Sequence, residues 1–279
     1  MRMPRSTWAG ALILGLMAVA AVVSPWLLPD PEAMDLGARF APLSAEHWLG
    51  ADELGRDIAA RLLQGGRVSL AVAAATALLA ALLGTLVGLV AGYYGGLADA
   101  TLMRLTDGVM ALPLLPLLIV LAAADPAKLG IAPETLASES FAVVRLVVII
   151  GCVGWTTVAR LVRASTLSVR SRDYVRAAVA VGAGPGRIML RHVLPNVASP
   201  MVVATTLSVG NIILIESALS FLGLGIRPPL ASWGNMLTGA MDVVWSAPVL
   251  AVWPGAAIFL TVLAFNLLGD GLQRAMERR

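Results

Sequence analysis

"RAAVAVGAGPGRIMLRHVLPN", residues 176–196, lies between two of the most hydrophobic stretches of this chain. Upstream of it, Asp173 suits the start of a short helix, and Gly182 and Gly184 are residues that end helices. A Pro185-Gly186 turn follows, and the remaining residues predict a second helix that stops at Pro195. We therefore expect a structured basic hairpin of two short helices between two apolar segments.

The first helix of this hairpin carries an apolar stripe at three- and four-residue spacing, formed by Val175, Ala178, Val179 and Gly182. The surrounding arginines are also compatible with a hairpin that rests on lipid head groups. However, the stripe lacks the bulky Leu, Phe or Trp side chains of interfacial anchors. Its small residues favour docking to another protein.

The composition indicates a membrane protein. Of the 279 residues, 58% are hydrophobic and 13% are charged, whereas soluble domains have about 45–50% apolar and about 25% charged residues. The single cysteine, Cys152, excludes an internal disulfide framework, and we expect it to be a small core residue. The basic pI of 9.6 does not require nucleic acid, because membrane proteins collect arginine on their cytoplasmic side.

Six segments are long and apolar enough to span a bilayer, which takes about 20 residues per helix. They are Trp8–Leu28, Val68–Ala91, about Met103–Ala124, Phe141–Ala159, Val197–Leu222 and Pro248–Leu268. The third contains Pro113 and Pro116 and should kink. The first is too long for a signal-peptide core and is followed by no small-residue cleavage site, so we expect it to be retained. In the second, Gly84, Gly88 and Gly92 share one face and favour close helix packing.

The distribution of basic residues predicts that both termini are cytoplasmic. In that orientation thirteen basic residues lie inside and six lie outside, as the positive-inside rule requires. The inside set is Arg2, Arg5, Arg104, Arg160, Arg163, Arg170, Arg172, Arg176, Arg187, Arg191, Arg274, Arg278 and Arg279, and the outside set is Arg39, Arg56, Arg61, Arg67, Lys128 and Arg227. The hairpin is then cytoplasmic.

Two charged residues, Arg145 and Glu216, fall within or near the predicted spans. Charges at membrane depth usually face a cavity or a partner. The long Arg145 side chain can instead reach the outer surface, which is the favoured interpretation, with a role in a transport pathway as the alternative. Glu216 is shorter, so a role in a pathway or gate and a structural role stay equally open.

The hairpin resembles the cytoplasmic signature loop of ABC importer permeases, written E-A-A-x3-G-x9-I-x-L-P. Ala177, Ala178, Gly182, Leu194 and Pro195 keep its spacing. Arg176 stands in place of the glutamate and His192 in place of the isoleucine. Residues 47–70, 216–237 and 254–272 also resemble the C-type permease subunit of dipeptide, oligopeptide and nickel importers. The resemblance covers nearly the whole chain from about residue 25.

This resemblance implies an all-α polytopic membrane protein with the type I ABC importer fold. Residues 1–66 would form a leading helix and an outside segment, and residues 67–279 a five-helix membrane domain with the coupling loop at 170–196. The hairpin would dock in a groove of a partner ATPase and move when the ATPases close on ATP. The residues expected to act in this coupling are Tyr174, Arg176, Ala177, Ala178, Gly182, Ala183, His192, Leu194 and Pro195.

The implied complex lies in the bacterial inner (plasma) membrane. It would contain a B-type permease subunit, two ABC ATPase subunits and an extracytoplasmic substrate-binding protein. We expect this chain to bind no cofactor or metal and to have no catalytic residue, with ATP and Mg²⁺ held by the ATPases. The sequence has no phosphate-loop motif, and its two histidines, His47 and His192, fall on opposite sides of the membrane.

The longest outside segment, residues 30–66, predicts a helix that starts at Asp52 and ends at Gly65-Gly66. Its charged residues Asp52, Glu53, Arg56 and Asp57 could contact the binding protein or form a solvated rim. Trp233, in the loop after the fifth span, would be either such a contact or part of a lid packed on the helices.

The cargo is less sharply determined than the fold. The outside loops contain no His, Cys or Asp cluster with metal-ligand spacing, which favours peptides. A nickel or metal-chelate importer is the alternative. A secondary transporter is a further alternative from another class, but such folds tend to show inverted repeats, and none is evident in the sequence.

Overall fold

The computed structural model describes residues 4–136 and 138–277 and is built of helices. Arg2, Arg278 and Arg279, which enter the orientation argument, lie outside the described residues. The helices are α1 (Arg5–Leu27), η1 (Leu36–Ala38), α2 (Ile58–Tyr94), α3 (Gly96–Ala111), α4 (Leu114–Ala123), η2 (Pro126–Leu129), α5 (Pro133–Leu136), α6 (Glu139–Arg170), α7 (Asp173–Ala180), α8 (Pro185–Ile188), η3 (Met189–Val193), α9 (Leu194–Phe221), α10 (Trp233–Asp242) and α11 (Val249–Glu277).

The six predicted membrane segments are all present in the expected order. Five continuous helices are long and apolar enough to cross a membrane, and α3 with α4 forms a sixth span that is bent by 87°. The backbone at Leu112 is extended (ψ 139°), because a proline disfavours helical geometry in the residue before it. The kink expected at Pro113 is therefore a complete break.

The longest helix, α2, packs along α6 through its glycine face. A Cβ atom at Gly84 would lie 2.6 Å from the carbonyl oxygen of Trp155, and one at Gly88 would lie 2.6 Å from that of Ala159. A Cβ at Gly92 would lie 2.7 Å from the Cβ of Thr166. These distances are too short for any side chain, so the predicted role of the three glycines in close helix packing is confirmed.

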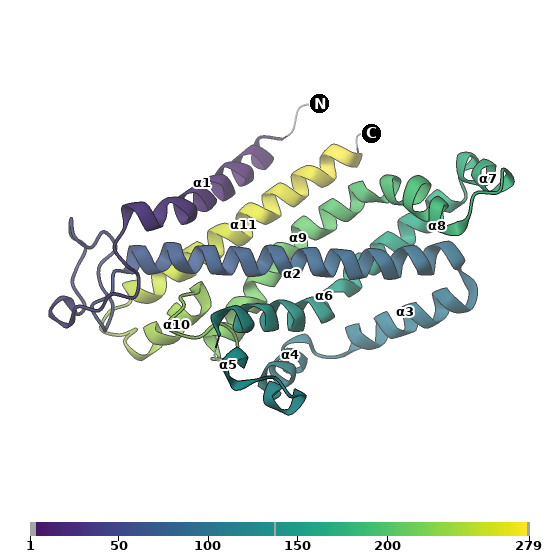
Figure 1. The fold of residues 1–279 in the computed structure, drawn as a ribbon. Helices are drawn as coiled ribbons and strands as arrows, with labels where there is room; N and C mark the ends of the chain where they lie inside the picture. Colours follow the sequence, from purple (N-terminus) through teal and green to yellow (C-terminus); the bar gives the residue numbers. More distant parts are fainter. Residues whose placement is uncertain (1–3, 137, 278–279) are drawn as a thin grey trace.

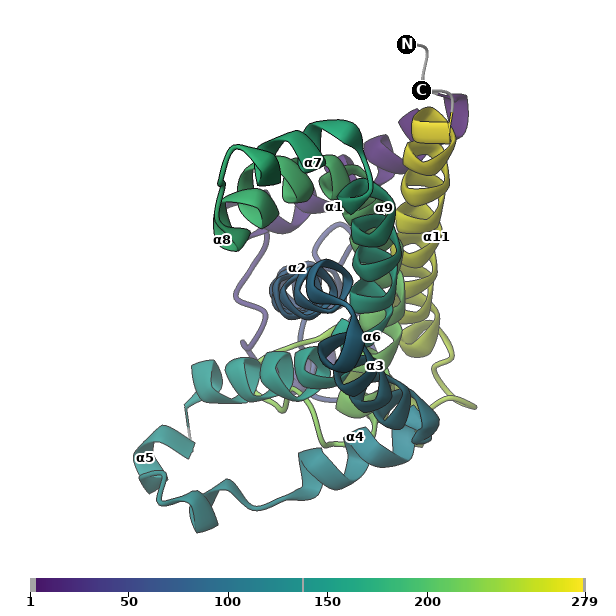
Figure 2. The ribbon, with the colours of Figure 1, turned by 90° about the vertical axis from the view of Figure 1, so that its right-hand side faces the viewer.

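The two ends of the helix bundle carry different elements. Figure 1 shows the start of α1, the end of α11 and the α7–α8 hairpin at one end, and α10 with the segment between α1 and α2 at the other. At the terminal end α1 lies against α11, where a Cβ at Gly10 would be 2.6 Å from the carbonyl oxygen of Ala264. Seen from the side in Figure 2, α3 and α4 lie away from α1 and α11. The described termini thus share one end of the bundle.

The start of α2 differs from the prediction. The helix begins at Ile58, not at Asp52, and Asp57 caps it by accepting a hydrogen bond from the Ala60 N–H at 2.8 Å. The two glycines expected to end the helix, Gly65 and Gly66, lie inside α2. They serve close packing, since a Cβ at Gly66 would lie 3.0 Å from the Trp233 ring. The expected division of the chain at residue 66 falls within this helix.

Replacing Gly88 by alanine should destabilise the protein. The new methyl group would meet the Ala159 carbonyl, and overpacking of this kind typically costs about 1–3 kcal/mol. Gly15→Ala in α1 is the matched control, because a Cβ there has no neighbour within 4 Å. The melting temperature in detergent should fall for Gly88→Ala and stay level or rise for Gly15→Ala. Equal melting temperatures would contradict the packing argument.

Candidate functional site

The hairpin consists of α7, a tight turn and the short helix α8. At the end of α7, Gly182 has φ +83°, a left-handed conformation that side chains other than glycine rarely adopt. Its N–H donates to the Val179 carbonyl at 2.9 Å, and the Ala183 N–H donates to the Ala178 carbonyl at 3.0 Å. The prediction that Gly182 ends the first helix is confirmed.

The hairpin has an inner face that packs on the bundle and an outer face that is exposed. The residues of the predicted apolar stripe are split between the two faces. Val175 is 1% exposed and Ala178 is buried, and Val175 packs with Leu89 of α2 and Val162 of α6. The other two stripe residues, Val179 and Gly182, are exposed. The expectation of one continuous docking face was therefore wrong, because half of the stripe anchors the hairpin to the bundle. The exposed outer face consists of Tyr174, Arg176, Ala177, Val179, Val181 and Gly182.

The hairpin is joined to the membrane by a continuous helix. Residues Pro185–Phe221 form one span, so the expectation that a helix stops at Pro195 was wrong. The chain passes Pro195 by widening into the π-helical turn η3, which accommodates a residue without an N–H. The side-chain amide of Asn196 donates to the His192 carbonyl at 2.7 Å. His192 and Leu194 are half-buried at this junction.

Ion pairs between α3 and α6 lie at the same end and were not anticipated from the sequence. Arg163 donates two hydrogen bonds to the Asp99 carboxylate, one of them from Nη2 to Oδ2 at 2.6 Å. Arg160 Nη2 lies 2.5 Å from Asp107 Oδ1. The available signal was Asp107 inside the third predicted span, since a charge in such a segment requires a partner, whereas Asp99 lies outside the predicted spans. These pairs hold α3, the first half of the broken span, on α6.

At the opposite end Glu216 is fully buried at the centre of a serine network. Its Oε1 accepts a hydrogen bond from Ser220 Oγ at 2.8 Å, and its Oε2 accepts one from Ser69 Oγ of α2 at 3.0 Å. Each serine also accepts a backbone N–H from the outer loop: Ile226 N donates to Ser220 at 3.0 Å, and Trp233 N donates to Ser69 at 3.3 Å. The carboxylate thus fixes both ends of the loop between α9 and α10.

Trp233 is a packed lid residue and not an exposed one. It is 2% exposed, and its indole N–H donates to the Leu62 carbonyl of α2 at 3.0 Å. Ser232 caps α10 together with Asn235 in a reciprocal capping box. Of the two interpretations of this residue, the structure favours the lid.

Most charged side chains of the outside segment are buried and paired within the chain, which corrects the expectation of exposed charges. Asp52, Arg56 and Asp57 are 6%, 9% and 4% exposed. Asp52 Oδ2 lies 2.7 Å from Arg56 Nε and 3.6 Å from Arg61 Nε, and Asp57 Oδ2 lies 3.1 Å from His47 Nδ1. These pairs fold the segment onto the bundle.

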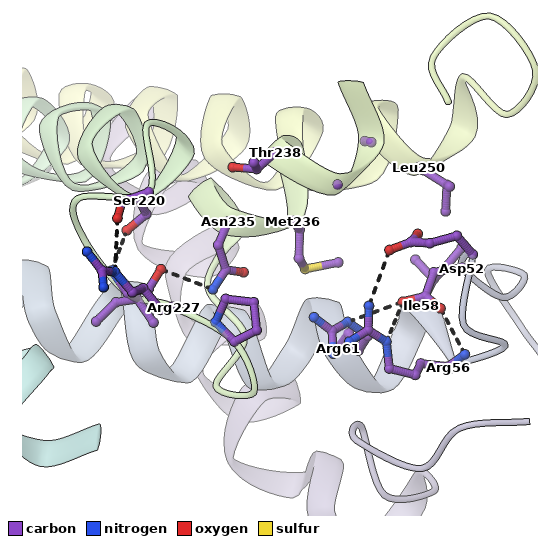
Figure 3. Close-up of a pocket in the computed structure, with 16 residues that line it drawn as sticks. Asp52, Arg56, Ile58, Arg61, Ser220, Arg227, Asn235, Met236, Thr238 and Leu250 are labelled. Carbon is purple, nitrogen blue, oxygen red and sulfur yellow. Dashed lines mark hydrogen bonds and ion pairs between the residues drawn. The ribbon is translucent and has the colours of Figure 1, made fainter. Parts of the chain in front are cut away.

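A cavity of about 270 Å³ lies beside these pairs. Figure 3 shows Asp52 facing Arg56 and Arg61, with Met236 of α10 near Arg61 and Asn235 farther along the cavity, on the side of Arg227. Glu53 is half-buried at this cavity. Contact of this region with a binding protein stays a prediction, with the cavity and its charged rim as the surface that remains available.

Two further residues have positions that the sequence did not indicate. The Arg145 guanidinium donates to the carbonyl oxygens of Ala122 and, at 2.8 Å, Ala124, so it caps the end of α4. Cys152 is exposed, and its expected place in the core was wrong. In the part of the chain that the structure describes, no three His, Cys, Asp or Glu residues are grouped as metal ligands would be.

Glu216→Ala should lower stability, because it leaves the Ser69 and Ser220 hydroxyls without their acceptor. A buried group left unpaired costs about 1–3 kcal/mol. Glu216→Gln keeps the side-chain volume and one acceptor oxygen, so its loss should be smaller. Melting of the two variants in detergent checks this order, and an Ala variant that melts with the parent protein would refute the anchoring role.

Residues 84–279 match the family described as binding-protein-dependent transport system inner membrane component. A Brucella ovis protein named as a peptide permease is 40% identical over 278 residues, which cover 99% of this chain and 87% of that protein. The nickel transport system permease protein NikC of Escherichia coli is 38% identical over 267 residues, covering 95% of this chain and 91% of NikC. The glutathione transport system permease protein GsiD of Escherichia coli is 39% identical and covers 96% of this chain and 84% of GsiD.

A solved structure with a similar fold is the crystal structure of an amino acid ABC transporter with histidines. The TM-score is 0.56 at 16% identity, and the match covers 77% of this chain and 94% of that chain. At this identity the likeness shows the fold alone.

Proposed function

We propose that this chain, which belongs to the family of binding-protein-dependent transport system inner membrane components, is the subunit that passes peptides across the membrane in its importer. The chain is a permease subunit of an ABC importer in the inner membrane, and it has no ATPase site of its own. ATP is hydrolysed by partner subunits. The expected type I importer fold is confirmed by the helices and their arrangement.

The hairpin is the observation that carries the proposal for how ATP hydrolysis acts on the membrane helices. Its inner face is fixed to α2 and α6 by Val175, while its outer face is open to a partner. The helix that leaves it is continuous from Pro185 to Phe221. Because no loop separates the hairpin from α9, a partner that displaces the hairpin would pull directly on α9. We infer that the outer face docks on the ATPase and that closure of the ATPases on ATP shifts α9.

The direction of the chain in the membrane follows from this assignment. The hairpin and both described ends of the chain lie at one end of the bundle, so a cytoplasmic ATPase would place all three in the cytoplasm. The excess of arginines at this end supports the same orientation. The Glu216 network, α10 and the cavity beside Asp52 would then face outward.

The family implies ATPase and substrate-binding protein partners. The finer composition is part of the proposal: a B-type permease supplies the other half of the pathway, and two ATPase subunits bind ATP and Mg²⁺. The substrate-binding protein would contact the outward end, where the cavity beside Asp52 offers an apolar floor and a charged rim. This chain would bind no cofactor.

Peptides are the proposed cargo, and nickel or a nickel chelate is the alternative. Among the relatives, the Brucella ovis protein is named for peptides and GsiD for glutathione, itself a small peptide. NikC is named for nickel at nearly the same identity. The balance of names supports peptides.

Uptake in a host without its own peptide and nickel importers tests this assignment. The chain is co-expressed with its ATPase, partner permease and binding protein, and accumulation of a labelled dipeptide and of labelled nickel is measured in parallel. Dipeptide uptake that disappears with an inactive ATPase supports the proposal. Nickel uptake without dipeptide uptake would overturn the cargo assignment.

Variants of the hairpin should separate docking from charge effects. Gly182→Arg forces a side chain into a left-handed turn, which costs about 1–3 kcal/mol, and places a long group on the outer face. Arg176→Glu changes an exposed side chain whose only described ion pair is with Asp173 at 3.2 Å. Dipeptide uptake and binding-protein-stimulated ATPase activity should therefore fall further in Gly182→Arg. Equal values for the two variants would count against docking through this turn.

A further inference from the structure

A cavity with a mostly apolar lining lies at the broken span. It measures about 440 Å³, a size typical of ligand pockets, and lies between α3, α4, α6 and α9. It is lined by Val109, Met110, Leu112, Leu114, Ile150, Val153, Gly154, Thr156, Thr157, Ala204, Leu207, Ser208, Asn211, Ile212 and Ile215. None of these residues carries a charge, an imidazole or a thiol.

Two polar side chains in this lining have no hydrogen-bond partner among the described residues. The Asn211 amide and the Thr157 hydroxyl are both exposed and unpaired. Ser208, three residues before Asn211 and therefore on the same face of α9, bonds only to the Thr205 carbonyl of its own helix at 2.8 Å. Together they form a neutral polar stripe in an otherwise apolar wall.

With the end of α9 placed at the membrane surface, Asn211 falls near the middle of the bilayer. It precedes the end of α9 at Phe221 by ten residues, which corresponds to about 15 Å at 1.5 Å per residue. The hydrocarbon core is about 30 Å thick. An unpaired amide at that depth would be costly against lipid, so it must face protein or a hydrated cavity.

The broken span leads to the same conclusion independently. The helical hydrogen bonds stop between Ala111 and Leu114, beside the cavity, and the span bends by 87°. Irregular backbone at membrane depth is tolerated only where it is buried in protein or lines a water-filled space. Two unrelated features of this wall thus exclude contact with lipid tails.

We propose that this cavity is the part of the pathway wall that touches the cargo in transit, and that Asn211 and Thr157 hydrogen-bond to its peptide groups. The inference rests on the proposed peptide-import function and names the residues that recognise the cargo. An asparagine amide both donates and accepts, which matches the N–H and C=O of a peptide unit. A neutral stripe can serve peptides of varied side chains, because it reads the backbone that they share. Bare nickel would find no preferred ligand here.

Substitution of the two residues tests this in the assembled importer. Asn211→Leu and Thr157→Val should each reduce dipeptide uptake about five- to tenfold, the effect of losing one hydrogen bond. Thr206→Val on α9 is the matched control, because its hydroxyl bonds to the Val202 carbonyl at 2.8 Å and does not line the cavity. Subunit co-purification should be the same for all three variants. Loss of the partner permease from Asn211→Leu would instead make Asn211 an assembly contact and overturn the proposal.

Cysteine labelling provides a second test that does not depend on turnover. In a Cys152→Ser background, a water-soluble thiol reagent should modify Asn211→Cys, and saturating dipeptide with the binding protein should protect it. Leu78→Cys on α2, an exposed apolar site outside the cavity, should stay unmodified. If the wild-type importer takes up no dipeptide, the proposed function fails. If it does, but neither variant reduces uptake and the dipeptide gives no protection, this inference alone fails.

Discussion

Gly84, Gly88 and Gly92 bring the backbone of α2 directly against α6, and the other elements are placed relative to that pair. At one end, Leu89 of α2 and Val158 and Val162 of α6 provide the apolar surface on which the hairpin rests. At the other end, Ser69 of α2 receives the Glu216 carboxylate of α9. Because two helices in such close contact cannot slide past each other without clashes, they give the bundle a rigid centre.

Some parts of the chain are fixed to the packed pair of α2 and α6, and other parts stay exposed. The outer loop is held at both ends by hydrogen bonds that pass through Ser69 and Ser220 to Glu216. Asp52 pairs with Arg56 in the segment before α2 and with Arg61 in the first turn of α2. The outer face of the hairpin is exposed, with one described ion pair between Arg176 and Asp173, and Asn211 and Thr157 in the cavity wall have no hydrogen-bond partner among the described residues. An importer subunit needs this combination, since it must stay assembled while it offers one surface to an ATPase and another to moving cargo.

The sequence was sufficient for the spans, the glycine face and the hairpin turn, because each depends on local periodicity or on the conformational freedom of one glycine. It failed where a distant contact or a local irregularity of the helix decides the outcome. Gly65 and Gly66 were predicted to end a helix, but they allow close packing of Ser232 and Trp233, which are more than 160 positions away in the sequence. Pro195 was predicted to end the second helix of the hairpin, but a π-helical turn before it lets the helix continue. The pairs of Asp99 with Arg163 and of Asp107 with Arg160 also depend on how α3 folds back on α6.

Cross-linking from the hairpin tests the central claim, that its outer face docks on the ATPase. A photoreactive residue at Val181, which is 85% exposed on the hairpin, is compared with one at Leu97 at the start of α3, which is 87% exposed at the same end of the bundle. In the assembled complex Val181 should cross-link to the ATPase subunit, and Leu97 should not. Equal cross-linking from both positions, or none from Val181, would contradict the account.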